Sequence, residues 1–131
     1  MIWSFSKRFG VGIGMAAIAA LPLHAQLLTV PVMEHATEDW DTCGQGQVYG
    51  LKSDGDGFLA VRTGPGSQFD KIDEVYNNDK VFLFDQHGDW FGVLYGVQEI
   101  DCGPINGSKP AVRPGAKAGW VHRDWVRVIA G

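Results

Sequence analysis

The sequence contains few of the residue patterns on which catalysis, metal binding or phosphate binding usually depend. Among its 131 residues there is no G-x-S-x-G, no H-E-x-x-H, no phosphate-binding glycine loop and no evident Ser/His/Asp arrangement. His35, His87 and His122 follow residue 25, and no two of them have the close spacing of a metal-ligand pair. We therefore expect no enzymatic activity, no metal site and no cofactor.

One fragment of a calcium-binding loop occurs, in the segment Asp54-Gly55-Asp56-Gly57. A complete loop needs further carboxylates at fixed spacing and a closing bidentate glutamate, and both are missing here. We therefore interpret this segment as a Gly/Asp turn.

Basic residues are scarce, with 11 Lys and Arg against 15 Asp and Glu. Without Lys7 and Arg8, which lie in the first 25 residues, nine basic residues remain against the same 15 acidic ones, a net charge of −6. Nucleic-acid affinity depends largely on Lys and Arg that neutralise phosphates. We therefore expect no nucleic-acid partner.

No apolar run is long enough to span a bilayer comfortably, since the longest, Phe9 to Leu23, has 15 residues and a span needs roughly 20. The run follows Lys7 and Arg8 and ends near Ala25, which predicts a signal peptide over residues 1–25 with cleavage after Ala25. An uncleaved amino-terminal anchor is the alternative. Cleavage would leave a periplasmic or secreted protein with no membrane attachment.

Only two cysteines are present, Cys43 and Cys102, and both follow the predicted cleavage site. Oxidising compartments favour their pairing, which predicts a disulfide. The chain-entropy model gives a cross-link over a loop of this length roughly 4 kcal/mol of stabilisation. A catalytic cysteine is the alternative, but the usual sequence surroundings of such a residue are missing.

The segment from Gly57 to Val128 carries an ordered series of short motifs. These are an opening Leu59, Val61, Arg62, Gly64 and Pro65, a turn at Asn77, Asn78 and Asp79, a strand with Val81 and Leu83, the pair Asp89 and Trp90, and a closing Gly119, Trp120 and Val121. In this order the series resembles a bacterial SH3 (SH3b) module. The resemblance implies an all-β protein: a small SH3-like barrel of about five to seven strands over residues 47–131, after an extended N-terminal arm over residues 26–46.

Alternating apolar residues predict strands at residues 47–51, 58–62, 69–75 and 80–85. Val61, Val81, Leu83 and Val121 fall on the inward phase and are expected to form the barrel core. Phe82 and Phe84 then point outward. Exposed phenylalanines of this kind are either covered by another segment or bind a ligand. The cover would come from the arm or from the insertion described next, and the alternative is an aromatic ligand face.

Residues 95–118 form an insertion in the hairpin that joins the Trp90 strand to the closing strand. Its 24 residues are rich in Gly and Pro, which indicates ordered turns rather than a helix. Loops of this length are uncommon in compact domains and are usually functional or disordered. We therefore expect protein-specific function to reside here.

The best candidate ligand surface surrounds Trp90, because aromatic residues flanked by polar groups line the shallow grooves of small barrels. The predicted ligand-binding residues are Asp85, His87, Asp89, Trp90, Tyr95, Trp120 and His122. The alternative for Trp90 and Trp120 is packing at the barrel rim. We expect Trp125, just before the last strand, to pack as well.

Two functions follow from this interpretation. The first is a non-catalytic binding module of the cell envelope, which recognises a cell-wall peptide or an envelope protein. The second is a periplasmic inhibitor or immunity-type protein that caps a partner enzyme or toxin with the long insertion.

Overall fold

The computed structural model describes residues 28–36, 43–52 and 57–130. The predicted signal peptide and most of the Asp54–Gly57 turn lie outside these ranges. The described strands are β1 (Met33–His35), β2 (Gly44–Val48), β3 (Leu59–Arg62), β4 (Lys71–Val75), β5 (Lys80–His87), β6 (Trp90–Tyr95), β7 (Ser108–Pro110), β8 (Lys117–His122) and β9 (Val126–Ala130). A single 3-10 turn, η2 (Arg123–Trp125), precedes β9 in this part of the chain.

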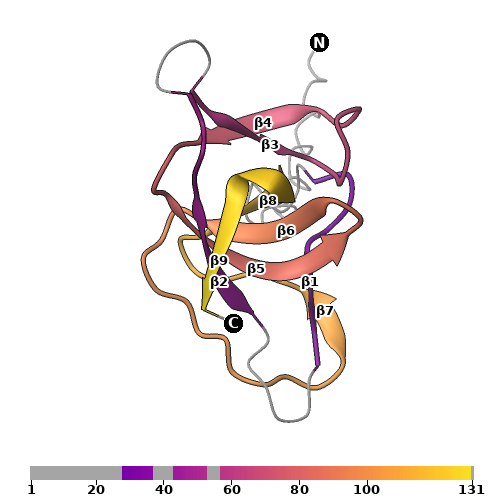
Figure 1. Ribbon diagram of the computed structural model, residues 1–131. Helices are drawn as coiled ribbons and strands as arrows, with labels where there is room; N and C mark the ends of the chain where they lie inside the picture. Colours follow the sequence, from indigo (N-terminus) through magenta and orange to yellow (C-terminus); the bar gives the residue numbers. More distant parts are fainter. Residues whose placement is uncertain (1–27, 37–42, 53–56, 131) are drawn as a thin grey trace, which may run out of the picture.

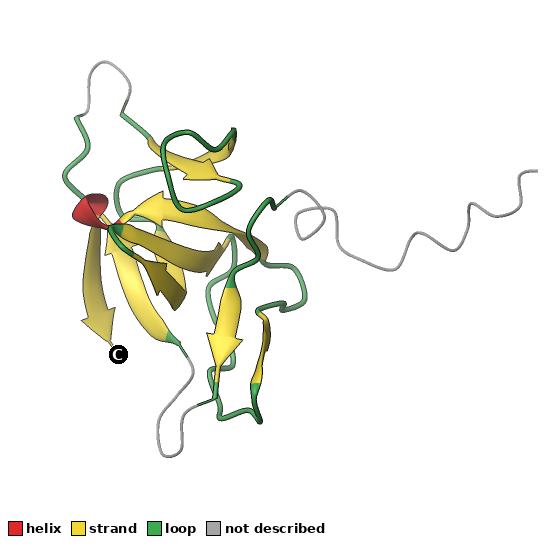
Figure 2. Ribbon diagram, turned by 90° about the vertical axis from the view of Figure 1, so that its right-hand side faces the viewer, coloured by secondary structure: helices red, strands yellow, loops and turns green. Residues whose placement is uncertain are grey.

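Seven strands form one antiparallel sheet in the order β4-β3-β8-β6-β5-β2-β9, and β1 pairs with β7 in a separate two-stranded sheet. The larger sheet curves into a small barrel, and the β1–β7 pair lies beside it (Figures 1 and 2). The predicted all-β, SH3-like barrel is therefore confirmed. Within the described ranges, no helix has the length and apolar character needed to cross a membrane.

The barrel begins earlier than the predicted strand at residues 47–51. Gly44 to Gln47 pair with Leu83 to Lys80 of β5, and β2 also pairs with β9 on its other side. Gly46 faces the core so closely that a Cβ there would lie 2.7 Å from Val126 Cγ1. Gly44 and Gly46 have low strand propensity, which is why the sequence did not indicate a strand there.

The remaining boundaries differ by one or two residues from the predicted strands. β3 starts at Leu59, β4 starts at Lys71 after the turn in which Phe69 N donates to Gly66 O, and β5 continues to His87. The predicted turn before β5 is present, with Asn78 at a φ of 77°. Asparagine tolerates this left-handed conformation better than most residues do.

The core inside the barrel is composed mainly of valine. Val61, Val81 and Val121 are fully buried in it, and Leu83 packs against it while partly buried. The inward phase predicted for these four residues is therefore confirmed.

Val81→Ala should lower the free energy of unfolding by about 1 to 3 kcal/mol, because it removes buried methyl groups and leaves a cavity. Val112→Ala is the matched control, since Val112 is 45% exposed and the same change there should be nearly silent. Chemical denaturation of both variants checks this. An unchanged midpoint for Val81→Ala would show that the strand phase is wrong.

Candidate functional site

The hairpin of β5 and β6 and the end of β8 bring three of the predicted ligand-binding residues together. His87 lies opposite Trp90, and Trp90 lies opposite His122, so the three side chains lie side by side across adjacent strands. The Trp90 and His122 ring centroids are 5.2 Å apart in an edge-to-face arrangement. We call these three residues the Trp90 row.

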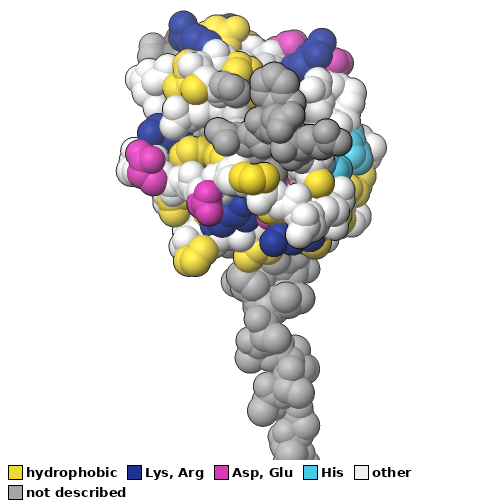
Figure 3. Space-filling view, turned by 90° about the horizontal axis from the view of Figure 1, so that it is seen from below, with side chains coloured by type: hydrophobic (Ala, Val, Ile, Leu, Met, Phe, Trp, Pro, Cys, Tyr) yellow, Lys and Arg dark blue, Asp and Glu magenta, His cyan; other side chains and the backbone are white. Residues whose placement is uncertain are grey.

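The Trp90 row lies at the surface. The side chains of His87 and His122 are 53% and 30% exposed, and Trp90 is partly exposed. Histidine side chains gather beside apolar ones at one margin of the face seen in Figure 3. Asp89, at the hairpin turn, pairs with Arg123 at 3.4 Å, and Arg123 N donates to Asp89 O. The ion pair and the backbone hydrogen bond together attach the tip of the hairpin to η2.

Asp85 lies behind this row, with its side chain only 6% exposed. Its Oδ1 is 3.2 Å from His35 Nε2 and 3.8 Å from His87 Nε2. Its Oδ2 accepts a hydrogen bond from Met33 N at 3.0 Å. Asp85 therefore connects the arm to the hairpin and hydrogen-bonds the His35 imidazole, and its carboxylate is largely shielded from solvent.

The rest of this sheet face is buried. Phe82, Phe84, Leu94 and Trp120 project from it and form a second apolar cluster with Val32 of the arm and Ala111 of the insertion. Phe82 and Phe84 are 3% and 6% exposed. Of the two interpretations of their outward phase, the cover is therefore confirmed, and the exposed aromatic ligand face is wrong.

The arm is held against this face largely through its backbone. Trp120 Nε1 donates to Val30 O at 2.8 Å, and Thr29 N and Val30 N both donate to Thr63 O. Gly92 lies under the arm, where a Cβ would come within 3.0 Å of Val32 Cγ1. Glycine at this position lets the arm approach the sheet closely.

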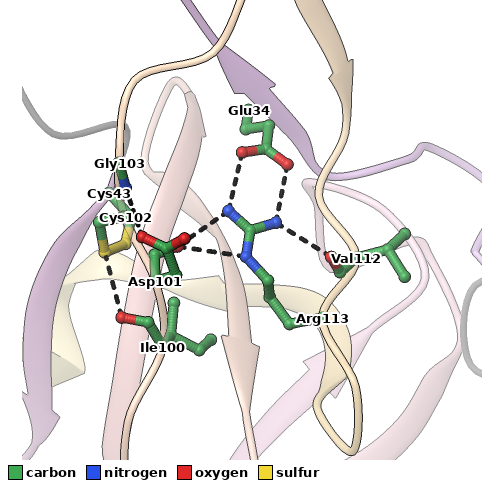
Figure 4. Close-up of polar contacts among 8 residues, drawn as sticks. All are labelled: Glu34, Cys43, Ile100, Asp101, Cys102, Gly103, Val112 and Arg113. Atoms are coloured by element: carbon green, nitrogen blue, oxygen red, sulfur yellow. Dashed lines mark hydrogen bonds and ion pairs between the residues drawn. A yellow bond between two sulfur atoms is a disulfide. The ribbon is translucent and has the colours of Figure 1, made fainter.

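The insertion is joined to the arm by a buried ion pair (Figure 4). Glu34 is fully buried, and its two carboxylate oxygens accept hydrogen bonds from Arg113 Nη1 and Nη2 at 2.9 and 3.0 Å. Arg113 also donates to the carbonyl oxygens of Asp101 and Val112. Hydrogen bonding to Glu34 raises the pKa of the Arg113 guanidinium.

The predicted disulfide lies next to this ion pair. Cys43 and Cys102 are bonded, with their Cα atoms 5.2 Å apart, which attaches the insertion to the start of β2. Ala111 N also donates to Val32 O at 2.8 Å beside the β1–β7 pair. The insertion is thus held by a covalent bond, a two-stranded sheet and an ion pair.

Two of the predicted ligand-binding residues lie in the interior. Trp120 is 0% exposed, with His87 over it at a ring distance of 5.0 Å. It packs, as the alternative held, but beneath the arm on the outer sheet face and not at the barrel rim. Tyr95 lies at the far end of β6 on the inner face and is 4% exposed. Neither side chain is part of the Trp90 row. Trp125, which we expected to pack, is 41% exposed.

Tyr95 lines a polar hollow of about 290 Å³ that lies away from the Trp90 row. Asp73, Lys80 and Lys117 also line this hollow. Its hydroxyl donates to Asp73 Oδ2 at 2.8 Å. Burial, with this hydrogen bond, raises the pKa of Tyr95. The pKa of Asp73 is lowered, because hydrogen bonds from Glu74 N and Tyr95 together with the charge of Lys117 outweigh its partial burial.

A second hollow, of about 540 Å³, adjoins Asp85. Both apolar and polar residues line it, namely His35, Leu83, Phe84, Asp85, Gln86, Phe91 and Val128. Among the residues that the structure describes, no group of three or more His, Cys, Asp or Glu side chains is arranged to hold a metal ion.

Sequence reasoning missed Glu34, His35, Arg113 and Arg123. Val32 and Glu34 are two residues apart and therefore share one face of an extended segment. This spacing is the one signal in the sequence for the burial of Glu34. An isolated glutamate in such a pattern is normally solvated, and only the arginine 79 residues away explains its burial.

Arg113→Ala should lower the free energy of unfolding by about 3 to 5 kcal/mol, because it leaves the Glu34 carboxylate buried without a partner. Lys117→Ala is the control, since it removes an exposed ion pair with Asp73 and should cost at most about 1 kcal/mol. The double variant Glu34→Leu/Arg113→Leu should recover much of the loss. Equal denaturation midpoints for the two single variants would contradict the assigned role of this pair.

The fold and the motif series agree with a comparison against protein-family models. The model of the bacterial SH3 domain matches residues 57–127, more than half of the chain. Comparisons with curated proteins and with solved structures give no significant match. The matched segment starts just before β3 and ends in β9, and includes the whole Trp90 hairpin together with the insertion. The chain belongs to the bacterial SH3 domain family.

Proposed function

We propose that this protein is a non-catalytic binding module of the cell envelope, which recognises a cell-wall peptide or an envelope protein through the Trp90 row and the neighbouring insertion. Membership of the bacterial SH3 family supports the general role, because such domains are typically binding modules. The signal-peptide pattern in residues 1–25 supports the location, which is the periplasm or the medium.

One observation carries the proposal. The arm and the insertion cover the apolar side chains of the outer sheet face, and this cover ends at Trp120 and Gly92. The Trp90 row continues the same face beyond the cover: Trp90 packs against the second apolar cluster and stays partly exposed, and His87 beside it is 53% exposed. An aromatic surface that the fold does not bury is the expected position for a ligand.

The chemistry of the Trp90 row suits a ligand with both apolar and hydrogen-bonding groups. The indole supplies a flat apolar surface, and the imidazoles of His87 and His122 can donate or accept. Asp89 and Arg123 place opposite charges at the end of the hairpin. None of these groups is arranged as a nucleophile with a base, which supports binding without chemistry.

The second candidate is a periplasmic inhibitor or immunity-type protein, and the attachment of the insertion favours it. The disulfide, the β1–β7 pair and the Glu34–Arg113 ion pair fix this segment before any partner arrives. Preorganised loops lose little conformational entropy on binding. Lys109 and Val112 are exposed on this segment and would face a partner protein.

Trp90→Ala should weaken binding by more than about 1 kcal/mol, because aromatic anchors dominate interface energies. The matched control is Trp125→Ala, since Trp125 is also partly exposed, at 41%, but lies outside the Trp90 row. Sedimentation of the mature protein with purified peptidoglycan sacculi measures the affinity. Unfolding midpoints of both variants must be measured alongside.

Affinity capture from envelope extract distinguishes the two candidates. Sedimentation with sacculi supports the binding module, and one stoichiometric protein partner that is lost on Val112→Asp supports the inhibitor. Point substitutions are preferable to deletion of the insertion, because Ala111 and Ile100 pack against the second apolar cluster. Binding that Trp90→Ala and Val112→Asp both leave unchanged would place the site elsewhere.

A further inference from the structure

Asparagine is rare in this chain, and its three asparagines lie in two exposed turns. Asn77 and Asn78 belong to the turn before β5, and Asn106 precedes Gly107 in the insertion, just before β7. All three asparagines are exposed. The side chain of an asparagine carries a carbonyl carbon that the next backbone nitrogen can attack. The surroundings of that nitrogen therefore decide whether each asparagine is chemically stable.

The turn before β5 protects both of its asparagines from this reaction. Asn77 Oδ1 accepts a hydrogen bond from Leu51 N at 3.0 Å, and Asn77 Nδ2 donates to Leu51 O at 2.9 Å. The backbone nitrogen of Asn78 donates to Val48 O at 2.8 Å, and the nitrogen of the next residue donates to Tyr76 O at 2.9 Å. Attack by either nitrogen would break a backbone hydrogen bond of the turn, which has a cost in free energy.

The surroundings of Asn106 are open by comparison. Among the described residues, none forms a hydrogen bond with the Asn106 side chain or with the backbone nitrogen of Gly107. Gly107 has a φ of 71°, and a Cβ built on it would meet no atom within 4 Å. Because glycine has no side chain, its nitrogen is unshielded and its backbone can rotate widely. The carbonyl carbon of the Asn106 side chain and the Gly107 nitrogen can therefore approach each other.

We propose that Asn106 is a site of spontaneous deamidation, with water as the only co-reactant. The Gly107 nitrogen attacks the carbonyl carbon of the Asn106 side chain and forms a C–N bond. The side-chain nitrogen leaves as ammonia and takes the proton of the attacking nitrogen with it. Water then opens the cyclic imide at one of its two carbonyl carbons. Opening at the side-chain carbon gives aspartate, opening at the main-chain carbon gives isoaspartate, and the net reaction exchanges one water for one ammonia.

The reaction changes the insertion in charge and in backbone length. Each product replaces a neutral amide with a carboxylate, so the net charge after residue 25 changes from −6 to −7. In isoaspartate the main chain also gains one carbon just before Ser108, which pairs with His35 of the arm. The exposed Lys109 follows in β7. A partner of the insertion would therefore meet a charge that changes with the age of the molecule, and this change does not depend on the proposed binding function.

Peptide mapping of the mature protein tests the proposal after incubation in mildly alkaline buffer, because base removes the proton of the attacking nitrogen. Trypsin separates the two turns after reduction of the disulfide, since it does not cleave before proline. Asn77 and Asn78 lie in peptide 72–80, and Asn106 is the only asparagine of peptide 81–117. Peptide 81–117 should gain the mass difference between a hydroxyl and an amino group, while peptide 72–80 stays unchanged. A sample digested without incubation corrects for deamidation during digestion.

Two variants test the assigned chemistry. Asn106→Gln keeps an amide but lengthens the side chain by one carbon, which disfavours ring closure, so the mass gain of peptide 81–117 should be lost. Gly107→Ala adds a methyl group beside the attacking nitrogen, in a place with open space around it, and should slow the gain severalfold. A peptide 81–117 that changes no faster than peptide 72–80 in the parent protein would overturn the proposal. So would a mass gain that Asn106→Gln leaves unaltered.

Discussion

The structure depends on covering a sheet that has large apolar side chains on both of its faces. β5 and β8 direct valines into the barrel and Phe82, Phe84 and Trp120 to the opposite side. A barrel of this size buries only the inner set. The outer set requires a second layer, and the arm and the insertion, which lie far apart in the sequence, supply it.

The polar contacts of this second layer follow from the same requirement. A chain laid over an apolar face loses water from its backbone, and each buried N–H or C=O then needs a partner. Trp120 and Asp85 provide two of these partners for the arm. Glu34 and Arg113 satisfy each other, with the remaining guanidinium hydrogens directed at carbonyl oxygens. The disulfide attaches the insertion to the start of β2.

The sequence predicts the part of the fold that depends on local alternation. Because successive side chains of a strand point to opposite faces, the sequence predicts that Val81 points inward and Phe82 outward. The pairing of the two cysteines follows from their being the only two. Tyr95 lies two residues from the buried Val93 and therefore on the same inward phase, a signal that its polar hydroxyl obscured. The burial of Trp120 and Glu34 depends on segments that lie 90 and 79 residues away. No local pattern contains that information, although the need for some cover was apparent.

The contact between Trp120 and Val30 has a consequence for the order in which the molecule is assembled. The two residues are 90 positions apart, and β2 likewise needs β9. The arm is synthesised early, yet its binding surface is complete only when the closing strand exists. Contacts this distant in sequence make folding slow, because a long loop has to close before they form. A nascent chain therefore carries an uncovered aromatic face until β8 is available to complete the surface that the arm covers.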